Sequence, residues 1–369
     1  MQVVSGLVRV AIVGGAGVFG RRLALLLADD RSFDVVIAGR SIAKAEALAR
    51  TIGAEATVLD RETATASELD RLNVDVVVDA SGPFDTLGPD PYRLAEAALQ
   101  AGAHYLDIAD GRDFVCGIDR LDLAARAANR FALSGASTTP ALSSAVCDAL
   151  VRDWTRVDSI EVGVTPGNRA PRGLAVVRSI LSYAGKPVRV FLGGQWGTAP
   201  GWGLTTRRDL APDLARRWLS LCDTPDLELF PERYRVTDRV VFRGGLELPV
   251  LHLGLLAASQ AVRLRIMPSL SLFSEMARDL ADVLIGFGTD RGGMIVEVKG
   301  LDTLGAPAAR TWTLVAEGGD GPNIPVLAAY ACLKKLDTIA PGARPCMGEV
   351  SLAAFESLFK RFRIRTEMR

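Results

Sequence analysis

The chain has 369 residues, with 43 basic and 43 acidic side chains and a formal net charge of zero. This length allows two domains with substantial cores, and the balanced charge argues against nucleic acid as a partner. The five cysteines are scattered without a CxxC spacing, so we expect no disulfide framework and no metal site, and reduced thiols in a cytoplasmic protein.

A glycine-rich turn follows the first predicted strand, residues 8–13, and precedes a helix predicted over 18–29. In such a unit Gly15 forms the tight turn, Gly17 lets the backbone approach a pyrophosphate, and Gly20 lets the helix pack on the strand. The alternative is a turn with only a structural role. The cofactor-binding residues predicted here are Gly14, Gly15, Gly17, Val18, Phe19 and Gly20.

The second predicted strand, residues 34–39, ends without an acidic residue. NAD-binding folds place Asp or Glu there to accept hydrogen bonds from the ribose. Arg40 occupies the position instead, next to Ser41 and one helical turn before Lys44. Because a guanidinium pairs bidentately with a phosphate, the pattern favours NADP over NAD. The alternative is that Arg40 and Lys44 are solvated charges at a helix start.

The first 140 residues alternate short apolar strands with helices rich in alanine and leucine. This alternation predicts a Rossmann-type α/β domain, a doubly wound parallel sheet whose ligand crevice lies between the first and fourth strands. The predicted strands are 8–13, 34–38, 56–59, 74–79, 104–108 and 131–135. The predicted helices are 18–29, 42–52, 91–101 and 118–129.

After Pro140 the pattern becomes α+β. Residues 293–299 and 310–316 predict an antiparallel hairpin. The apolar region 266–287 carries charges at helical spacing, which predicts an amphipathic helix rather than a membrane span. Other strands are predicted at 159–165, 187–192 and 239–243, and helices at 144–154, 173–184, 247–261 and 270–286. We predict a nucleotide-binding domain over 1–140, a substrate domain over 141–320, and C-terminal helices over 321–369 that pack back on the first domain.

Three segments resemble the saccharopine dehydrogenase-like NADP-dependent oxidoreductases. They are the glycine turn followed by AGRS, VVVDASGPFDTLGPDPYRLAEAALQAGAHYLDIADGRDFV at 76–115, and FALSGASTTPALSSAVCDAL at 131–150. The resemblance covers about 150 N-terminal residues, the span of a cofactor domain. It implies a Rossmann NADP-binding domain followed by an α+β domain with much of the substrate site. It also implies that the nicotinamide ribose lies beside Ala80, Ser81, Gly82, Pro83 and Phe84.

Tyr105 and Asp110 are the candidate catalytic residues, at or beyond the end of the fifth predicted strand. A proton must move when a hydride moves, and a carboxylate in an apolar crevice can have a pKa suited to that transfer. Strand alternation places Tyr105 and Asp107 on one face, with Asp110 in the loop beyond. Asp107 fits the capping of loop amides as well as a chemical role, so Asp110 is our first choice.

His104, His252 and Cys147 have the residue types of a general base or a nucleophile. Each lies in or next to an apolar run, where packing is the commoner use of these side chains. We therefore expect the two histidines to be packing or surface residues and Cys147 to be a buried packing residue. Arg169, Arg172 and residues 195–197 are candidate contacts for a substrate carboxylate. The GPNIP segment, residues 321–325, either closes the cofactor pocket or uses its proline to start a helix.

These observations predict an NADP(H)-dependent oxidoreductase that transfers a hydride at a C–N or C–O carbon of a small, amino-acid-like substrate. The alternative is a structural or sensing protein that binds NADP(H) without catalysis. We expect no nucleic acid, no membrane and no metal as partners. The apolar composition is compatible with a homodimer.

Overall fold

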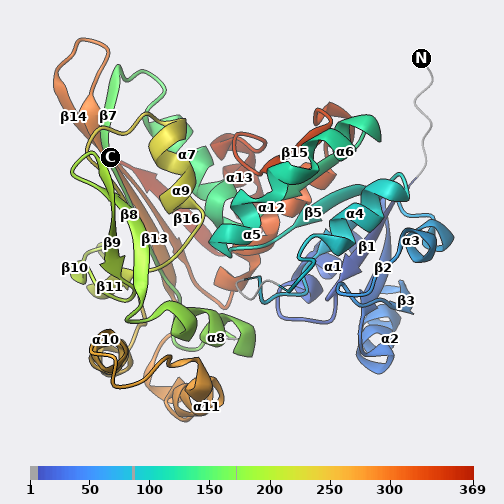
Figure 1. Ribbon diagram of the computed structural model, residues 1–369, viewed down its shortest axis with the longest axis horizontal. Coiled ribbons are helices and arrows are strands. Elements are labelled where there is room, and N and C mark those ends of the chain that lie inside the picture. Colours follow the sequence, from blue (N-terminus) through green and yellow to red (C-terminus); the bar gives the residue numbers. More distant parts are fainter. Residues whose placement is uncertain (1–6, 85–87, 172) are drawn as a thin grey trace. The chain divides into compact units, whose positions relative to one another are not determined.

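The computed structural model describes residues 7–84, 88–171 and 173–369 (Figure 1). The chain forms two compact units. One comprises Met1–Ala141 with Asn323–Val350, and the other Leu142–Pro322 with Ser351–Arg369. Each unit is therefore completed by a segment from the C-terminal part of the chain.

The first unit contains a seven-stranded parallel sheet in the order β15-β6-β5-β4-β1-β2-β3. The predicted α/β class and doubly wound order are confirmed, because β1 pairs in parallel with both β2 and β4. Its strands are β1 (Val8–Val13), β2 (Phe33–Gly39), β3 (Glu55–Val58), β4 (Val76–Asp79), β5 (His104–Asp107), β6 (Phe131–Ser134) and β15 (Gly342–Pro345). The seventh strand, β15, was not predicted, since it joins β6 from more than 200 residues further along the chain.

The helices of the first unit bury alanine and leucine against this sheet. They are α1 (Gly20–Ala28), α2 (Ile42–Ile52), α3 (Ala66–Leu72), α4 (Arg93–Gln100), α5 (Arg112–Cys116), α6 (Asp122–Ala127) and α12 (Ile324–Leu333). Helix α12 lies against α1, where the Tyr330 hydroxyl and Lys334 Nζ both donate to Asp30 at 2.8 Å. Pro325 lies in the first turn of α12, so the proline of GPNIP starts a helix.

The second unit contains a mixed sheet in the order β10-β11-β12-β7-β13-β14-β16, with β8 paired to β12 and β9. The predicted hairpin is confirmed by the antiparallel pairing of β13 with β14. Its strands are β7 (Arg156–Thr165), β8 (Pro187–Leu192), β9 (Gln195–Pro200), β10 (Thr206–Arg208), β11 (Arg217–Leu221), β12 (Arg239–Gly244), β13 (Gly292–Leu301), β14 (Pro307–Ala316) and β16 (Ile364–Met368). Its helices are α7 (Ser143–Leu150), α8 (Leu174–Tyr183), α9 (Asp226–Arg233), α10 (Pro249–Arg263), α11 (Ser274–Val283) and α13 (Leu352–Phe359).

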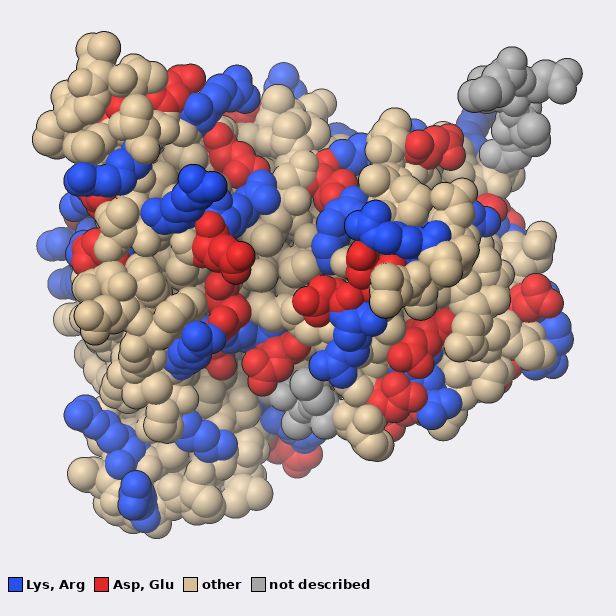
Figure 2. Space-filling model, turned by 45° about the horizontal axis from the view of Figure 1, so that its top comes forward, with Lys and Arg blue, Asp and Glu red and all other residues tan. Residues whose placement is uncertain are grey.

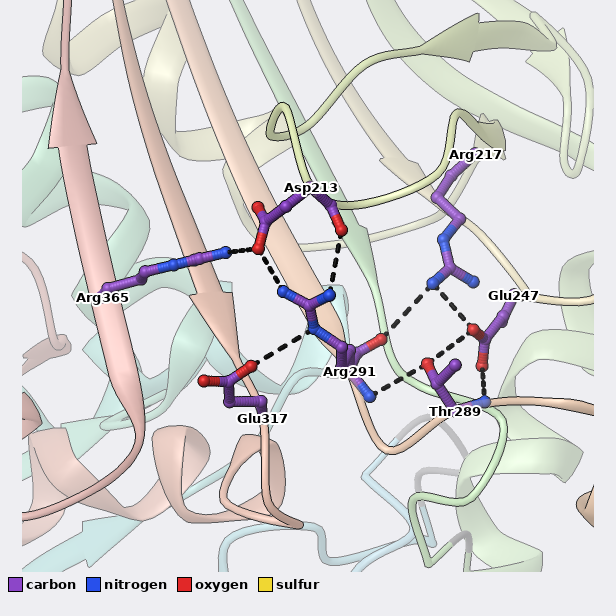
Figure 3. A network of polar contacts seen from close by, with 7 residues as sticks. All are labelled: Asp213, Arg217, Glu247, Thr289, Arg291, Glu317 and Arg365. Atoms are coloured by element: carbon purple, nitrogen blue, oxygen red, sulfur yellow. Dashed lines mark hydrogen bonds and ion pairs between the residues drawn. The ribbon is translucent and has the colours of Figure 1, made fainter.

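A network of charged side chains fixes the loops at one end of this sheet (Figure 3). The Glu247 carboxylate accepts hydrogen bonds from Arg217 at 2.9 Å and from the Thr289 amide and hydroxyl at 2.8 and 2.7 Å. Asp213 binds both Arg291 and Arg365, which joins the segment before β11 to β16. Arg217 and Glu247 are nearly buried, so removal of either partner would leave an uncompensated charge.

Basic and acidic side chains are interspersed over the face drawn in Figure 2. Within the described ranges, no helix combines the length and the apolarity that crossing a bilayer requires. The predicted amphipathic helix is present as α11, with short 3₁₀ turns at Ser271–Phe273 and Ile285–Phe287 on either side.

Asp226, the first residue of α9, is fully buried, and its burial raises the pKa of the carboxyl to about 8. An unfolded aspartate titrates near pH 4, so between these values the folded protein holds a proton that the unfolded chain has lost. The contribution of this group to the free energy of unfolding therefore falls as the pH rises, by about 1.4 kcal/mol per pH unit, and levels off above about pH 8.

We expect Asp226→Asn to remove this dependence, because the amide does not titrate. Unfolding of the wild-type chain and the variant would be measured by calorimetry from about pH 5 to about pH 9. The stability of the variant should rise relative to the wild-type chain across this range. Asp70→Asn, an exposed site in α3, is the matched control. Parallel pH profiles for wild type and Asp226→Asn would contradict the assignment.

Candidate cofactor-binding site

The glycine turn between β1 and α1 has the geometry that a nucleotide site needs. Gly20 is buried, and a Cβ there would lie 2.3 Å from the Gly14 carbonyl oxygen, so the first residue of α1 packs closely on the turn. Gly17 is exposed, and a Cβ there would meet only the Gly14 oxygen, at 3.0 Å. The backbone at Gly17 is therefore open to a ligand. Val18 and Phe19 are half-buried and complete the turn.

The sharp bend of the turn lies at Gly14 rather than at Gly15, which corrects our prediction. Gly14 has a φ of +77°, in the region that favours glycine. A Cβ at Gly14 would lie 2.7 Å from the backbone of Ala80 and Ser81. Gly15 instead packs against the Ile12 carbonyl, where a Cβ would lie at 2.9 Å. The turn and the loop after β4 therefore approach each other backbone to backbone at the switch point of the sheet.

Asp79, the last residue of β4, holds this loop in place. It is fully buried, and its carboxylate accepts hydrogen bonds from the Ser81 amide at 2.9 Å and from the Ser81 hydroxyl. Phe84 closes the loop by packing on Phe114, with ring centroids 5.1 Å apart. Ala80, Ser81, Gly82 and Pro83 are half-buried, so the loop presents part of its surface to solvent.

Arg61 lies beneath the same loop and was not predicted. Its Nε is 3.6 Å from the Asp79 carboxylate, and its guanidinium lies over the rings of Phe84 and Phe114 at 4.7 and 5.3 Å. Arg61 lies beyond the end of β3, and no pattern in the sequence indicated that its side chain would reach β4. The available signal was an aspartate ending the otherwise apolar run VVVD, residues 76–79, which requires a partner when buried.

Arg40, Ser41 and Lys44 lie at the carboxyl end of β2 and are all exposed. Ser41 is the N-cap residue of α2, but its hydroxyl caps no backbone amide, and the first turn of α2 contains no acidic residue. Among the described residues none forms an ion pair with Arg40. Positive potential is therefore concentrated at the N-terminus of α2, where the Arg40 and Lys44 cations lie beside the Ser41 hydroxyl. Such groups can form hydrogen bonds and ion pairs with a phosphate.

The candidate catalytic residues have different surroundings. Asp110 is exposed in the loop after β5. Tyr105 is 1 % exposed, and its hydroxyl lies 3.5 Å from Asp79 Oδ2. Burial raises the pKa of Tyr105 well above its usual value. The catalytic roles of Asp110 and Tyr105 remain predictions.

Asp107 is fully buried and accepts hydrogen bonds from the amides of Ala109 at 3.0 Å and Gly135 at 2.7 Å. Burial raises its pKa to about 7, although these hydrogen bonds act in the opposite direction. Asp107 thus joins the loops that follow β5 and β6, which is the capping use considered above.

Comparison with known families identifies the first unit. Residues 10–139 match the family described as the saccharopine dehydrogenase NADP binding domain. This segment belongs to that family. A comparison with curated protein sequences found no match. The matched segment contains the glycine turn, the basic residues after β2 and the loop after β4.

Two solved structures share the fold over nearly the whole chain. Apo saccharopine dehydrogenase (L-Glu forming) from Saccharomyces cerevisiae has a TM-score of 0.69 and 15% identity, covering 98% of this chain and 99% of that one. Homospermidine synthase from Legionella pneumophila, solved in complex with NAD, has a TM-score of 0.63 and 12% identity, covering 98% of this chain and 91% of that one. These likenesses extend the shared fold to the second unit.

His104 and His252 are packing residues, as expected. His104 stacks on Phe131 and accepts a hydrogen bond from its amide at 3.2 Å, while His252 is fully buried and lies 2.9 Å from the Ser220 hydroxyl. Burial lowers the pKa of both imidazoles to about 4. Cys147 is also fully buried, and burial raises the pKa of its thiol, which disfavours a nucleophilic thiolate.

The described candidate substrate contacts of the second unit, Arg169 and Trp196, interact with different partners. Arg169 donates to the Gly286 carbonyl at 3.4 Å. Trp196 lies on β9, beneath the guanidinium of Arg189 at 3.9 Å. Arg172 lies outside the described residues. The role of residues 195–197 in substrate binding therefore remains a prediction.

We expect Gly17→Val to abolish nucleotide binding while the first unit stays folded. Residue 17 is exposed, so the branched valine side chain would occupy the path of the pyrophosphate without disturbing the core. Gly20→Val should instead destabilise the domain, since its side chain would meet the Gly14 backbone. Titration calorimetry and thermal unfolding of both variants separate the two effects. Normal NADPH binding by Gly17→Val would show that this glycine serves only local backbone geometry.

Proposed function

We propose that this protein is an NADP(H)-dependent oxidoreductase that transfers a hydride at a C–N or C–O carbon of a small, amino-acid-like substrate. The observation that carries the proposal is the exposed group Arg40, Ser41 and Lys44, placed where an NAD-binding domain has a carboxylate. Membership of the NADP-binding domain family supports the same cofactor.

The basic group is joined directly to the glycine turn. The amides of Gly14 and Gly15 both donate to the Ala38 carbonyl, at 2.9 and 3.2 Å. Arg40 lies two residues after Ala38, just beyond the end of β2, so the position of its backbone is fixed relative to the glycine turn. A dinucleotide whose pyrophosphate rests on Gly17 would then direct its adenosine ribose toward Arg40 and Ser41. The guanidinium would bind the 2′-phosphate.

The loop after β4 would receive the nicotinamide half. Its backbone contacts Gly14, and Asp79 and Arg61 hold it from below. Ser81 through Phe84 would then lie beside the nicotinamide ribose. The cofactor supplies the hydride, and Asp110 in the exposed loop after β5 would exchange the proton.

A second function is favoured by one observation, the burial of two of the three candidate acid–base side chains. Tyr105 and Asp107 are buried and engaged with Asp79 and loop amides. A protein that binds NADP(H) for structure or sensing needs no exposed acid–base pair. Screening amine, amino-acid and oxo-acid pairs for loss of the reduced-nicotinamide absorbance distinguishes the two functions. NADPH binding without turnover of any pair would favour the second.

We expect NADPH to bind at least about tenfold more tightly than NADH, a difference of about 1.4 kcal/mol supplied by contacts with the 2′-phosphate. Arg40→Ala should remove most of this difference by weakening NADPH binding alone. Arg50→Ala, an exposed arginine at the other end of α2, is the control and should leave the ratio unchanged. Equal affinities of the wild-type protein for NADPH and NADH in calorimetry would end the NADP assignment.

We expect Asp110→Asn to lower turnover by about 100-fold or more with NADPH affinity intact, because the amide keeps the shape but cannot exchange the proton. Steady-state kinetics on the substrate found in the screen would measure it. Asp113→Asn, an exposed aspartate on α5, is the matched control. Turnover near wild type in Asp110→Asn would assign the proton transfer to another group or to water.

A further inference from the structure

Two fully buried carboxyl groups lie next to each other at the carboxyl edge of the first unit's sheet. Asp79 ends β4 and Asp107 ends β5, and the two residues are partners in the register of these strands. Their side chains therefore leave the sheet on the same face, from backbones about 4.8 Å apart. Within the described ranges Arg61 is the only ion-pair partner of either group, through its 3.6 Å contact with Asp79.

One arginine balances only one of these two charges. A second buried carboxylate without a cation is costly, and a like charge beside it adds to the cost, so the pair favours a state in which one group is protonated. Asp79 has Arg61 as its partner and also accepts a hydrogen bond from the Ser81 amide at 2.9 Å. Asp79 therefore keeps the negative charge, and Asp107 is left to hold the proton.

The contacts of Asp107 suit a protonated carboxyl group. Its Oδ1 accepts hydrogen bonds from the amides of Ala109 and Gly135. Its Oδ2 and the hydroxyl oxygen of Ser134 are buried, interact with each other, and have no other partner among the described residues. A proton on Oδ2 would be donated to this hydroxyl oxygen. Burial, with a smaller effect from the charge of Asp79, raises the pKa of Asp107 to about 7.

The other titratable groups around Asp107 are uncharged at neutral pH. They are Tyr92 before α4, Tyr105 on β5 and Cys346 after β15. Burial raises the pKa of both tyrosines, and the neighbouring Cys332 thiol together with burial raises the pKa of Cys346. None of the three therefore adds a charge to the pair.

We infer that Asp79 and Asp107 share one proton, carried by Asp107, and that this proton keeps the loops at the carboxyl edge in place. Asp79 holds Ser81 in the loop after β4, and Asp107 holds the amide of Ala109, which precedes Asp110. Without the proton a second negative charge would be buried beside Asp79, so opening of the loops to water would become easier. Asp107 is thus a positioning residue for Asp110. The consequence for turnover rests on the proposed function, whereas the shared proton does not.

Infrared spectroscopy of the full chain tests for the proton directly, because a protonated carboxyl group absorbs at a different frequency from a carboxylate. At about pH 6 the wild-type spectrum should contain a protonated-carboxyl band that Asp107→Asn lacks. Asp226 contributes a band of its own to both spectra. Asp113→Asn, an exposed site on α5, is the control and should leave the band unchanged. Identical spectra of the wild type and Asp107→Asn would overturn the inference.

The influence of the neighbouring charge is tested by the pH at which this band disappears. Asp79→Asn removes the like charge and leaves Arg61 to pair with Asp107, so the midpoint should fall by about one pH unit or more relative to the wild type. An unchanged midpoint would show that the two groups do not share a proton. This comparison does not depend on the folding of Asp107→Asn.

Hydrogen exchange followed by NMR tests the effect on the loops. When the loops open, the hydrated Asp107 loses its proton. The protection of the Ala109 and Gly135 amides, corrected for intrinsic exchange, should therefore fall by up to about tenfold per pH unit from about pH 5 to about pH 7. Asp107→Asn does not titrate and should show no such fall.

Loss of this protection in Asp107→Asn at about pH 6, with an intact fold by circular dichroism, would mean that the ionised carboxylate holds the loops, and it would overturn the positioning role. All three measurements use the free chain. They therefore decide the inference whether or not the protein turns over any substrate in the screen.

Discussion

The close backbone approach at Gly14 is the constraint on which the cofactor site depends. No side chain fits between this residue and the loop at Ala80 and Ser81, so the turn after β1 and the loop after β4 must be placed together. Asp79 then holds Ser81, and Arg61 neutralises Asp79. A contact between two backbones is thus supported by a buried ion pair, which fixes the backbone at the switch point of the sheet.

In the first unit, buried carboxylates form hydrogen bonds that hold loops in place, whereas the charged groups proposed to bind ligands are exposed. Asp79 and Asp107 end neighbouring strands, and each accepts hydrogen bonds from the loop that follows. Desolvation makes such groups costly unless they are hydrogen-bonded, so they become part of the scaffold. Arg40 and Asp110 lie at the same carboxyl edge of the sheet but remain exposed. This difference separates the groups that shape the site from those proposed to act in it.

The second unit distributes its apolar residues differently. Its sheet is buried at Val162 and Val296 on adjacent strands, while the loops at its end are fixed by Asp213, Glu247 and their arginines. Helix α11 buries only Ser274 and Ala281 and exposes Met276, Leu280 and Val283. The unit therefore has a stable interior and, separately, an apolar surface that its own fold leaves uncovered.

Most of the first unit could be predicted from the sequence, and the candidate cofactor-binding residues were chosen from the same pattern. Strands buried on both faces appear as continuous apolar runs, and the glycine turn and Arg40 occupy fixed positions relative to those runs. Contacts between distant segments could not be predicted in this way. Strand β15 and the Arg61–Asp79 pair join segments that are distant in the chain, and β9 to β11 are short and flanked by polar residues. Periodicity correctly predicted that α11 has two unlike faces, but it could not say which face is covered, because that depends on what the helix packs against.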